Sequence, residues 1–507
     1  MRTNDTNDFT TKGGVRVTRT TEPETYEGAR MLLVDSLDSR RGVLLSSDFE
    51  YPGRYTRWDM GFIDPPVEIS AVGRAARVCA LSDRGRVLVD ALASRLPDLD
   101  FLDGYDVTDD GFNAQIKQST ERFPEEQRSK QPSIFSLIRE VLDFFGAPEE
   151  EPFFGLYGSF GYNLAFQFEP LDRKQNIDSD QRDLLVYLPD RLLLVDHQRG
   201  EALWHAYEFE AGGRSTAGMP RSGPVEPFKF AAPGPTESDH APGEYGMTVS
   251  KAKEYFKAGD LFETVPGVNT WQPVTEPPSE IFRRLMTANP APYGFFMNIG
   301  EQEYLVGASP EMFVRVEGRR VETCPISGTI RRGADPIQDA SQILTLLNSK
   351  KDESELTMCT DVDRNDKSRI CEPGSVEVIG RRQIEMYSRL IHTVDHVIGT
   401  LRPEFDALDA FLSHAWAVTV TGAPKKWAMQ FIEDHERSPR RWYGGAVGAA
   451  FANGNMNPGL TLRTIQFKDG IASVRAGATL LYDSDPNEEE DEIHVKASAF
   501  LDAISKP

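Results

Sequence analysis

Residues 303–333 read EYLVGASPEMFVRVEGRRVETCPISGTIRRG. Three short runs follow one another here, EYLVGAS, MFVRVEG and RRVETCPI, and each has the length and apolar content of a β-strand. The last run breaks into Ser327, Gly328 and Thr329, with two arginines and a glycine behind them. The stretch therefore predicts strands that end in a polar, glycine-containing turn, and the backbone amides of such a turn can hold an anion.

Further strand-like runs follow towards the C-terminus: RLIHTVDHVIGTL, LTLRTIQF and IASVRAGATLLY. Between the runs, helical patterns occur at about 337–360, 405–414, 424–437 and 488–503. Because strands and helices do not alternate regularly, the pattern predicts an α+β fold of layered β-sheets flanked by helices, and not a doubly wound parallel sheet.

Glycine, proline and serine become frequent between residues 211 and 244, which is typical of a linker or a long surface excursion. We therefore expect an N-terminal region over residues 1–210, with a regulatory or packing role, and a catalytic domain over residues 245–507. The segment 211–244 would connect them.

The composition excludes several classes of function. The net charge of −23 argues against a nucleic-acid surface, which needs clustered cations. No run of about 18 apolar residues could span a membrane, and the polar N-terminus is unlike a signal peptide. The four cysteines form no CxxC pair, and neither a nucleotide fingerprint nor an HExxH zinc motif is present. We expect a cytoplasmic globular protein.

Two helical patterns carry paired acids. Asp352 and Glu355 stand three residues apart, as do Glu489 and Glu492, and Lys496 follows four residues after Glu492. Two such helices facing one another could hold Mg²⁺ through one or two carboxylates, with water and an anionic substrate completing the octahedron. The alternative is a solvated acidic face, since seven of the ten residues in DSDPNEEEDE (483–492) are acidic.

Several motifs together resemble those of the chorismate-utilising enzymes, and most closely anthranilate synthase component I. They are GASPE (307–311), PISGT (325–329), DVDRND (361–366), ICEPGS (370–375), TGAPK (421–425), YGGAVG (443–448) and RAGAT (475–479). The match is dense over roughly residues 245–505. The N-terminal region matches more loosely, through VLLSSDFEYPGRYTRWDMGF (43–62) and FGLYGSFGYN (154–163), and is similar to the version often fused to a glutaminase domain.

The resemblance implies that Gly328 and Thr329 cradle the ring carboxylate of chorismate. It also separates the chemistries within the family. Relatives that aminate chorismate at C4 commonly carry a lysine where Ser327 stands, and isochorismate and salicylate synthases carry one where Glu263 stands. Serine without a base is a poor nucleophile, and a carboxylate cannot replace the lysine that activates water. Amination at C2 is therefore favoured over both routes.

The resemblance further implies a role for each site residue. Glu355 and Glu492 would hold Mg²⁺, with Asp352 and Glu489 supporting them. Glu311 would be the general acid that protonates the departing C4 hydroxyl. His392 would assist the loss of pyruvate, although its alternation with Leu390 and Val394 also fits a core histidine, and His396 shares its strand face. The remaining pocket residues would be Arg463 and Lys496, which meet substrate carboxylates, and Tyr443, Gly477 and Ala478, which line the wall. Thr479 stands where many relatives have a glycine.

The implied reaction converts chorismate and ammonia into anthranilate and pyruvate, in tryptophan biosynthesis. The alternative is a synthase that stops at 2-amino-2-deoxyisochorismate, and a non-catalytic paralogue would have lost Glu311, Glu355 or Glu492. No cysteine lies in a Gly-x-Cys-x-Gly glutaminase motif, so ammonia would come from solution, from a glutamine amidotransferase subunit or from a fused domain. We also expect an oligomer.

Tryptophan is a possible feedback inhibitor. In the family the inhibitor lies between two segments, which read LLSS (44–47) and NPAPYGFF (289–296) in this chain. The candidate inhibitor-binding residues are therefore Leu44, Ser46, Asn289 and Pro290. Ser46 and Gly294 replace an acid and a methionine of the family pattern, so two contacts would differ.

Overall fold

The computed structural model describes residues 5–48, 55, 57–121, 123–175, 178–387 and 390–505. Within them the helices are α1 (Met31–Leu37), α2 (Asp83–Ala93), α3 (Ile134–Phe144), α4 (Glu244–Ala258), α5 (Pro278–Ala288), α6 (Pro336–Asn348), α7 (Lys350–Ser368), α8 (Ala407–His414), α9 (Val418–Thr421), α10 (Lys425–His435) and α11 (Pro486–Ser505). None of these helices combines the length and the apolar composition that a membrane crossing needs.

The first of two large sheets has thirteen strands among the described residues. They are β1 (Thr6–Thr10), β2 (Arg16–Glu24), β3 (Gly42–Ser46), β4 (Trp58–Ile63), β11 (Arg191–Asp196), β12 (Glu201–Ala211), β13 (Arg214–Ser215), β14 (Glu237–Ser238), β16 (Gly267–Pro273), β17 (Tyr293–Asn298), β18 (Glu303–Ser309), β27 (Thr464–Lys468) and β28 (Ile471–Gly477). Their order is β1-β2-β12-β11-β4-β3-β17-β18-β27-β28-β16-β14, with β13 beside β12.

The second sheet also has thirteen described strands. They are β5 (Val67–Val72), β6 (Ala75–Ala80), β7 (Leu102–Thr108), β8 (Gly111–Ile116), β9 (Gly155–Phe160), β10 (Leu184–Leu188), β19 (Arg315–Glu317), β20 (Arg320–Thr323), β21 (Ile326–Arg331), β22 (Glu377–Met386), β23 (Leu390–Thr400), β25 (Ala446–Phe451) and β26 (Met456–Leu460). Their order is β21-β23-β20-β19-β26-β25-β9-β10-β5-β6-β8-β7, with β22 beside β23, and a short pair joins β15 (Glu263–Thr264) to β24 (Gly422–Ala423).

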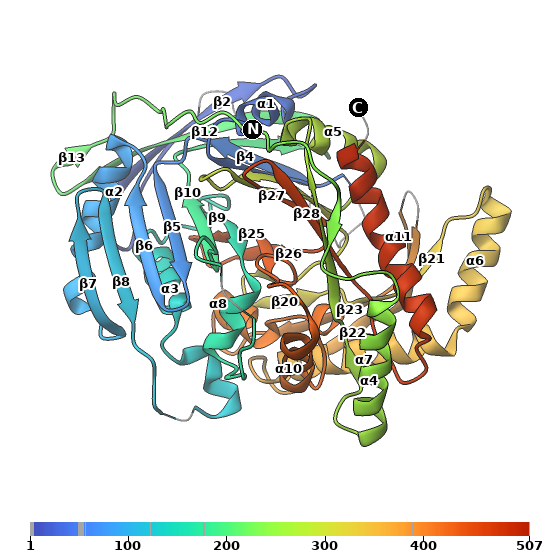
Figure 1. The fold of residues 1–507 in the computed structure, drawn as a ribbon. Helices are drawn as coiled ribbons and strands as arrows, with labels where there is room; N and C mark the ends of the chain where they lie inside the picture. Colours follow the sequence, from blue (N-terminus) through green and yellow to red (C-terminus); the bar gives the residue numbers. More distant parts are fainter. Residues whose placement is uncertain are drawn as a thin grey trace.

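The two sheets pack against each other, and helices cover their outer faces. A core between the sheets joins residues of β3, β4, β11, β17 and β18 to residues of β9, β10 and β25. A second core lies between the first sheet and α1, α4, α5, α10 and α11. Figure 1 shows α11 running beside β28, with α4 and α7 near its lower end. The expected α+β fold of layered sheets flanked by helices is confirmed.

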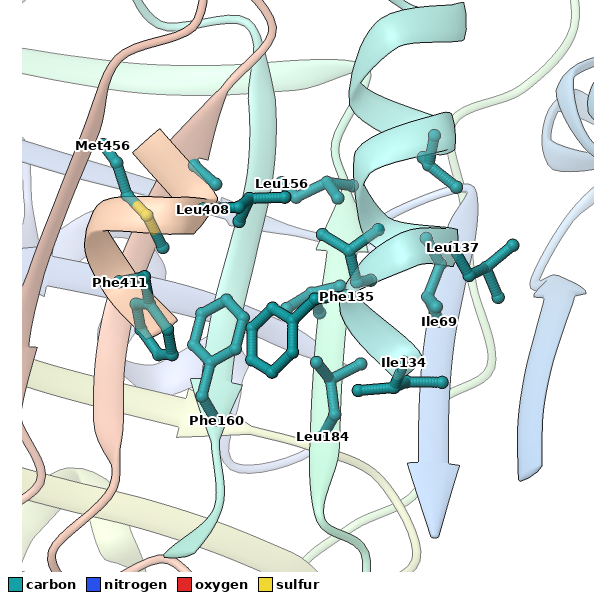
Figure 2. Packing of buried hydrophobic residues seen from close by; sticks show 14 of the residues in the cluster. Ile69, Ile134, Phe135, Leu137, Leu156, Phe160, Leu184, Leu408, Phe411 and Met456 are labelled. Atoms are coloured by element: carbon teal, nitrogen blue, oxygen red, sulfur yellow. The ribbon is translucent and has the colours of Figure 1, made fainter. Parts of the chain in front are cut away.

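The third and largest core lies between the second sheet and helices α2, α3 and α8. Figure 2 shows its centre, where Phe135 of α3, Phe160 of β9 and Phe411 of α8 meet. The ring centroids of Phe160 and Phe411 lie 4.9 Å apart, and those of Phe135 and Phe411 lie 5.4 Å apart. Each buried ring of this size contributes about 2–3 kcal/mol by leaving water. This core fixes the second sheet, which carries β21 and β23.

Two details differ from the expected pattern. Both sheets draw strands from residues 1–210 and from residues 245–507, so the segment 211–244 separates stretches of chain rather than sheets. The helix expected at 337–360 is two helices, α6 and α7. Ser349 leaves the helical conformation at φ −71° and ψ 117°, and its hydroxyl accepts a hydrogen bond from the backbone N–H of Asp352. The serine ends one helix and caps the next.

Candidate active site

A β-bulge places the turn at Ser327, Gly328 and Thr329 beside His392. In the pairing of β21 with β23, Ser327 lies opposite Thr393 and Thr329 lies opposite His392, which leaves Gly328 as the extra residue. Gly328 has φ +75°, in the left-handed region that glycine adopts without strain. The bulge lies against the first turn of α7, because a Cβ atom at Gly328 would stand 3.1 Å from the Cβ atom of Asp352.

His392 is a buried, neutral imidazole. Its Nδ1 lies 2.9 Å from the Thr329 hydroxyl and 3.3 Å from the carbonyl oxygen of Gly328. Because a carbonyl oxygen only accepts, this contact assigns the ring proton to Nδ1. Nε2 is then an acceptor, and it has no hydrogen-bond partner among the described residues. Burial, with the charges of Arg463 and Lys496, lowers the pKa of His392 to about 3.

Glu311 is a buried acid that keeps its proton at neutral pH. It follows β18 and is 5% exposed. Thr419 of the short helix α9 donates a hydrogen bond of 2.9 Å to its Oε1. Burial raises the pKa of Glu311 to about 8, although the Thr419 hydrogen bond and the charge of Arg463 oppose the shift. A carboxyl group with this pKa can donate a proton to a leaving group.

The acid pairs of α7 and α11 face each other across the same pocket. Burial raises the pKa of Glu355 to about 7, and repulsion from Asp352 and Glu492 acts in the same direction. The pKa of Glu492 is lowered, because the ammonium of Lys496, 2.7 Å from its Oε1, outweighs the effect of burial. Glu355 and Glu492 are therefore close enough to interact while differing in their affinity for a proton.

Glu489 of α11 pairs with a lysine of the facing helix α7. It is 2% exposed, its Oε1 lies 3.1 Å from the ammonium of Lys351, and its Oε2 has no described hydrogen-bond partner. The described residues hold no ready cluster of three or more metal-ligating side chains. Mg²⁺ needs only one or two protein carboxylates when a substrate anion supplies the rest. Glu355 and Glu492 fit that requirement, with Asp352 and Glu489 behind them.

Glu263 and Ser327 lie buried near Glu355. Glu263, in β15, is fully buried, and neither of its carboxyl oxygens has a hydrogen-bond partner among the described residues. Its burial, together with the charge of Glu355, raises its pKa well above the usual value. The Ser327 hydroxyl is also buried, it forms no hydrogen bond of good geometry with a described group, and it lies near Glu355, whose pKa it lowers. Both polar groups are free to meet a ligand.

Arg463 supplies a cation to the pocket. It has φ +48°, a left-handed conformation that costs a non-glycine residue on the order of 1–3 kcal/mol and is typical of functional sites. Burial lowers its pKa, which Tyr387, Glu311 and Tyr443 counteract. No carboxylate among the described residues forms an ion pair with it. An unpaired, partly buried guanidinium is well suited to a carboxylate ligand.

The wall formed by the end of β28 and by α11 is tightly packed. Lys496 donates a hydrogen bond of 3.0 Å to the carbonyl oxygen of Gly477. A Cβ atom at Gly477 would lie 3.1 Å from the Tyr443 hydroxyl, so only glycine leaves room for that group. Ala478 is fully buried behind it. The structure thus brings together the predicted catalytic, metal and substrate-binding residues.

The two candidate inhibitor segments also meet. β3 pairs with β17 so that Ser46 lies opposite Gly294. Leu44 and Ser46 are buried on β3, and Asn289 follows α5, where its N–H donates to the Leu285 carbonyl oxygen at 2.8 Å. Pro290 comes next in the chain, before β17. Two of the candidate residues therefore lie on β3, and the other two lie in the loop that leads from α5 into its neighbour β17.

Sequence reasoning did not identify two residues that hold the acids in place. Thr419 binds Glu311, and Lys351 pairs with Glu489. Lys351 could have been found, because it precedes Asp352 in a helix of alternating charges. Thr419 gives no such signal, since a threonine in an apolar run is also typical of a strand.

Most of the chain is similar to proteins of known family. Residues 103–502 match the family described as chorismate binding enzyme. The chain is 56% identical over 496 residues to anthranilate synthase of Azospirillum brasilense, covering 98% of this chain and 68% of that protein. It is 31% identical to anthranilate synthase component 1 of Vibrio cholerae, covering 92% of each.

Solved structures show the same fold. Anthranilate synthase component I from Streptococcus pneumoniae matches with a TM-score of 0.65 and 25% identity, over 90% of this chain and 94% of that one. The menaquinone-specific isochorismate synthase from Escherichia coli matches with a TM-score of 0.66 over 98% of this chain and 96% of its own, at 15% identity. At that identity the second likeness concerns the fold alone.

Proposed function

The chain belongs to the family of chorismate binding enzymes, and within it we propose that it is the aminating subunit of an anthranilate synthase. It converts chorismate and ammonia into anthranilate and pyruvate, in tryptophan biosynthesis. The long matches to anthranilate synthases support this function over a synthase that stops at 2-amino-2-deoxyisochorismate.

The observation that carries the proposal is the chemistry at two buried positions beside Glu355. Ser327 and Glu263 stand where relatives with other reactions have lysines, and both present polar atoms without a described partner. Ser327 lies beside Glu355, but that carboxylate would hold Mg²⁺, so no free base is left to make the serine a nucleophile. Burial and the charge of Glu355 raise the pKa of Glu263, and a carboxyl group is never cationic, so it does not act as the cationic group of a water-activating site. Ammonia is then the nucleophile that the pocket accepts.

The substrate carboxylates meet two groups of donors. The bulge at Gly328 and Thr329 receives the ring carboxylate, and the unpaired guanidinium of Arg463 forms charge-assisted hydrogen bonds with a carboxylate. Lys496, already held by Gly477 and Glu492, adds a second cation. Mg²⁺, held by Glu355 and Glu492, would neutralise and orient the substrate carboxylate when bound.

In the first step the ammonia lone pair forms the C2–N bond, and both double bonds of the ring shift, from C1=C2 to C1=C6 and from C5=C6 to C4=C5, as the C4–O bond breaks. Glu311 gives its proton to the departing hydroxyl, which leaves as water. Its raised pKa, near 8, means that the proton is present at neutral pH. The amine loses one proton, which gives 2-amino-2-deoxyisochorismate.

In the second step C2 loses its proton and the bond to the enolpyruvyl oxygen breaks, so that the ring becomes aromatic and the released enol takes up a proton as pyruvate. His392 is neutral and presents Nε2 as a free acceptor. It orients the intermediate by accepting a hydrogen bond. An imidazole with so low a pKa stores no proton between steps.

Ammonia is supplied by a glutamine amidotransferase partner or from solution. Tryptophan binds where the segments that carry β3 and β17 meet, at Leu44, Ser46, Asn289 and Pro290, with Ser46 and Gly294 altering the contacts. The adjacency of these two strands supports that position.

The test is anthranilate fluorescence from the purified chain with chorismate, Mg²⁺ and ammonium salt. Glu311→Gln removes the acid, and Glu317→Gln is the matched control, because Glu317 has an exposed side chain (67%) six residues further along the chain. We expect wild type and E317Q to form anthranilate at similar rates, and E311Q to be slower by about 10²–10⁴-fold. An inactive wild type, or an E311Q variant as fast as E317Q, would contradict the proposal.

A further inference from the structure

A buried ionic cluster lies behind Glu311 and has no part in the chemistry above. Lys367 of α7 is fully buried, and its ammonium lies 2.9 Å from Oδ2 of Asp363 and 3.3 Å from Nε2 of His414. It also donates to the Thr323 hydroxyl, which in turn donates to Asp363 at 2.6 Å. A lysine ammonium that is fully buried needs partners of this kind.

The protonation states within the cluster follow from its contacts. Nδ1 of His414 lies 2.7 Å from the Ala410 carbonyl oxygen, so this nitrogen carries the proton and Nε2 accepts from Lys367. Burial and the charge of Lys367 lower the pKa of His414 to about 3. The pKa of Asp363 is lowered despite its burial, because of Lys367. The cluster is thus one carboxylate, one ammonium and one neutral imidazole.

A small cavity with several polar groups in its wall joins this cluster to the general acid. It has a volume of about 30 Å³, the space of about two water molecules. Its polar lining comes from Glu311, Thr323, Asp363, Asp366, His414 and Thr419, and its apolar lining includes Met312, Phe313 and Val418. Beyond Asp366, the ammonium of Lys425 lies 2.6 Å from that carboxylate and is partly exposed to solvent.

We propose that Asp363, with Lys367 and His414, is the positioning group for Glu311: it keeps the acid protonated and anchors the cavity water through which Glu311 regains its proton after each turnover. The proposal rests on the function proposed above. Each turnover takes one proton from Glu311 for the departing water and releases one from the new amine. The proton that restores Glu311 enters from solvent along the cavity. The enzyme therefore takes up as many protons as it releases in each turnover.

The charges that face Glu311 act in opposite directions. Asp363, from α7, raises its pKa, and Arg463 lowers it. Asp366 and Cys359 on α7 and His414 on α8 also line the cavity. Replacing Asp363 by asparagine removes the anion and leaves the Lys367 cation without its counter-charge. Both changes favour the carboxylate form of Glu311.

The test is the pH profile of kcat/KM in the Asp363→Asn variant, at a fixed concentration of unprotonated ammonia. We expect its alkaline limb to move to lower pH by about one unit. Asp409→Asn is the matched control: Asp409 is a fully buried carboxylate of α8, with Lys130 at 2.5 Å and Arg139 at 3.1 Å. The alkaline limb of D409N should lie at the same pH as that of the wild type. A limb in D363N that coincides with that of D409N overturns the proposal.

The double variant D363N/K367M removes both charges and so avoids an unpaired buried cation that could unfold the protein. We expect its alkaline limb to return towards wild type, while kcat falls several-fold and its solvent deuterium isotope effect rises. A wild-type kcat and isotope effect in the double variant would refute the proton-return role. A wild-type enzyme that forms no anthranilate would instead refute the proposed function.

Discussion

Replacing Gly328 by alanine tests whether the bulge shapes the substrate site. At φ +75° an alanine pays about 1–2 kcal/mol for the left-handed conformation. Its Cβ would also stand 3.0 Å from the Thr393 hydroxyl oxygen and 3.1 Å from both the Asp352 Cβ and the Leu346 Cδ1. Overpacking of this kind adds about 1–3 kcal/mol. We expect a total loss of about 2–5 kcal/mol in the free energy of unfolding.

The same substitution at Gly318 separates strain from crowding. Gly318 has φ +59° in the turn between β19 and β20, and a Cβ there would meet nothing within 4 Å. G318A should therefore lose only about 1–2 kcal/mol, with an unchanged KM for chorismate. G328A should raise that KM by about 10-fold or more, because its new methyl group pushes the turn away from α7. Denaturant unfolding and steady-state kinetics measure both quantities. Equal stability and equal KM in the two variants would mean that the bulge at Gly328 does not shape the substrate site.

Three further predictions concern the acids. The alkaline limb of kcat/KM should lie near pH 8, because Glu311 works in its protonated form and loses the proton as pH rises through its pKa. A profile of kcat/KM that stays flat from pH 7 to pH 9, at a fixed concentration of free ammonia, would contradict this. Glu355→Gln should raise the Mg²⁺ concentration for half-maximal rate by about 10-fold or more, as a magnesium titration would show, and an unchanged midpoint would exclude Glu355 as a ligand. Glu436→Gln should lower the free energy of unfolding by about 3–5 kcal/mol, because the buried Glu436 pairs with Arg440 at 2.7 Å and with Arg475 at 3.0 Å. A loss below about 1 kcal/mol, measured by denaturant unfolding, would contradict this prediction.

Local patterns were enough to predict much of the fold. The three predicted runs within residues 303–326 contain strands β18, β19 and β20, but the turn expected at Ser327–Thr329 is a bulge within a further strand, β21. The break at Ser349 was not predicted, because the charged residues on both sides favour a helix and only the serine's cap marks the boundary. The pairing of β3 with β17 joins residues some 250 positions apart, and no local pattern specifies such a contact.

The candidate site, like the fold, was predicted only in part from the sequence. Motifs identified Glu311, Glu355 and His392, but a sequence does not show how deeply a group is buried, and burial is what raises the pKa of Glu311. The segment DVDRNDK reads as a solvated charged helix face, yet Lys367 within it is fully buried. Its partners His414 and Thr323 come from α8 and β20, so only the packing of three elements shows the cluster.

The central claim is that this pocket aminates chorismate at C2 and then eliminates pyruvate. The most direct measurement is product analysis by mass spectrometry after incubation with chorismate, Mg²⁺ and ¹⁵N-ammonium, with pyruvate measured in the same sample. We expect anthranilate that carries one ¹⁵N atom, with one pyruvate released for each anthranilate. A ¹⁵N-labelled product that keeps its enolpyruvyl group, or isochorismate without label, would contradict it.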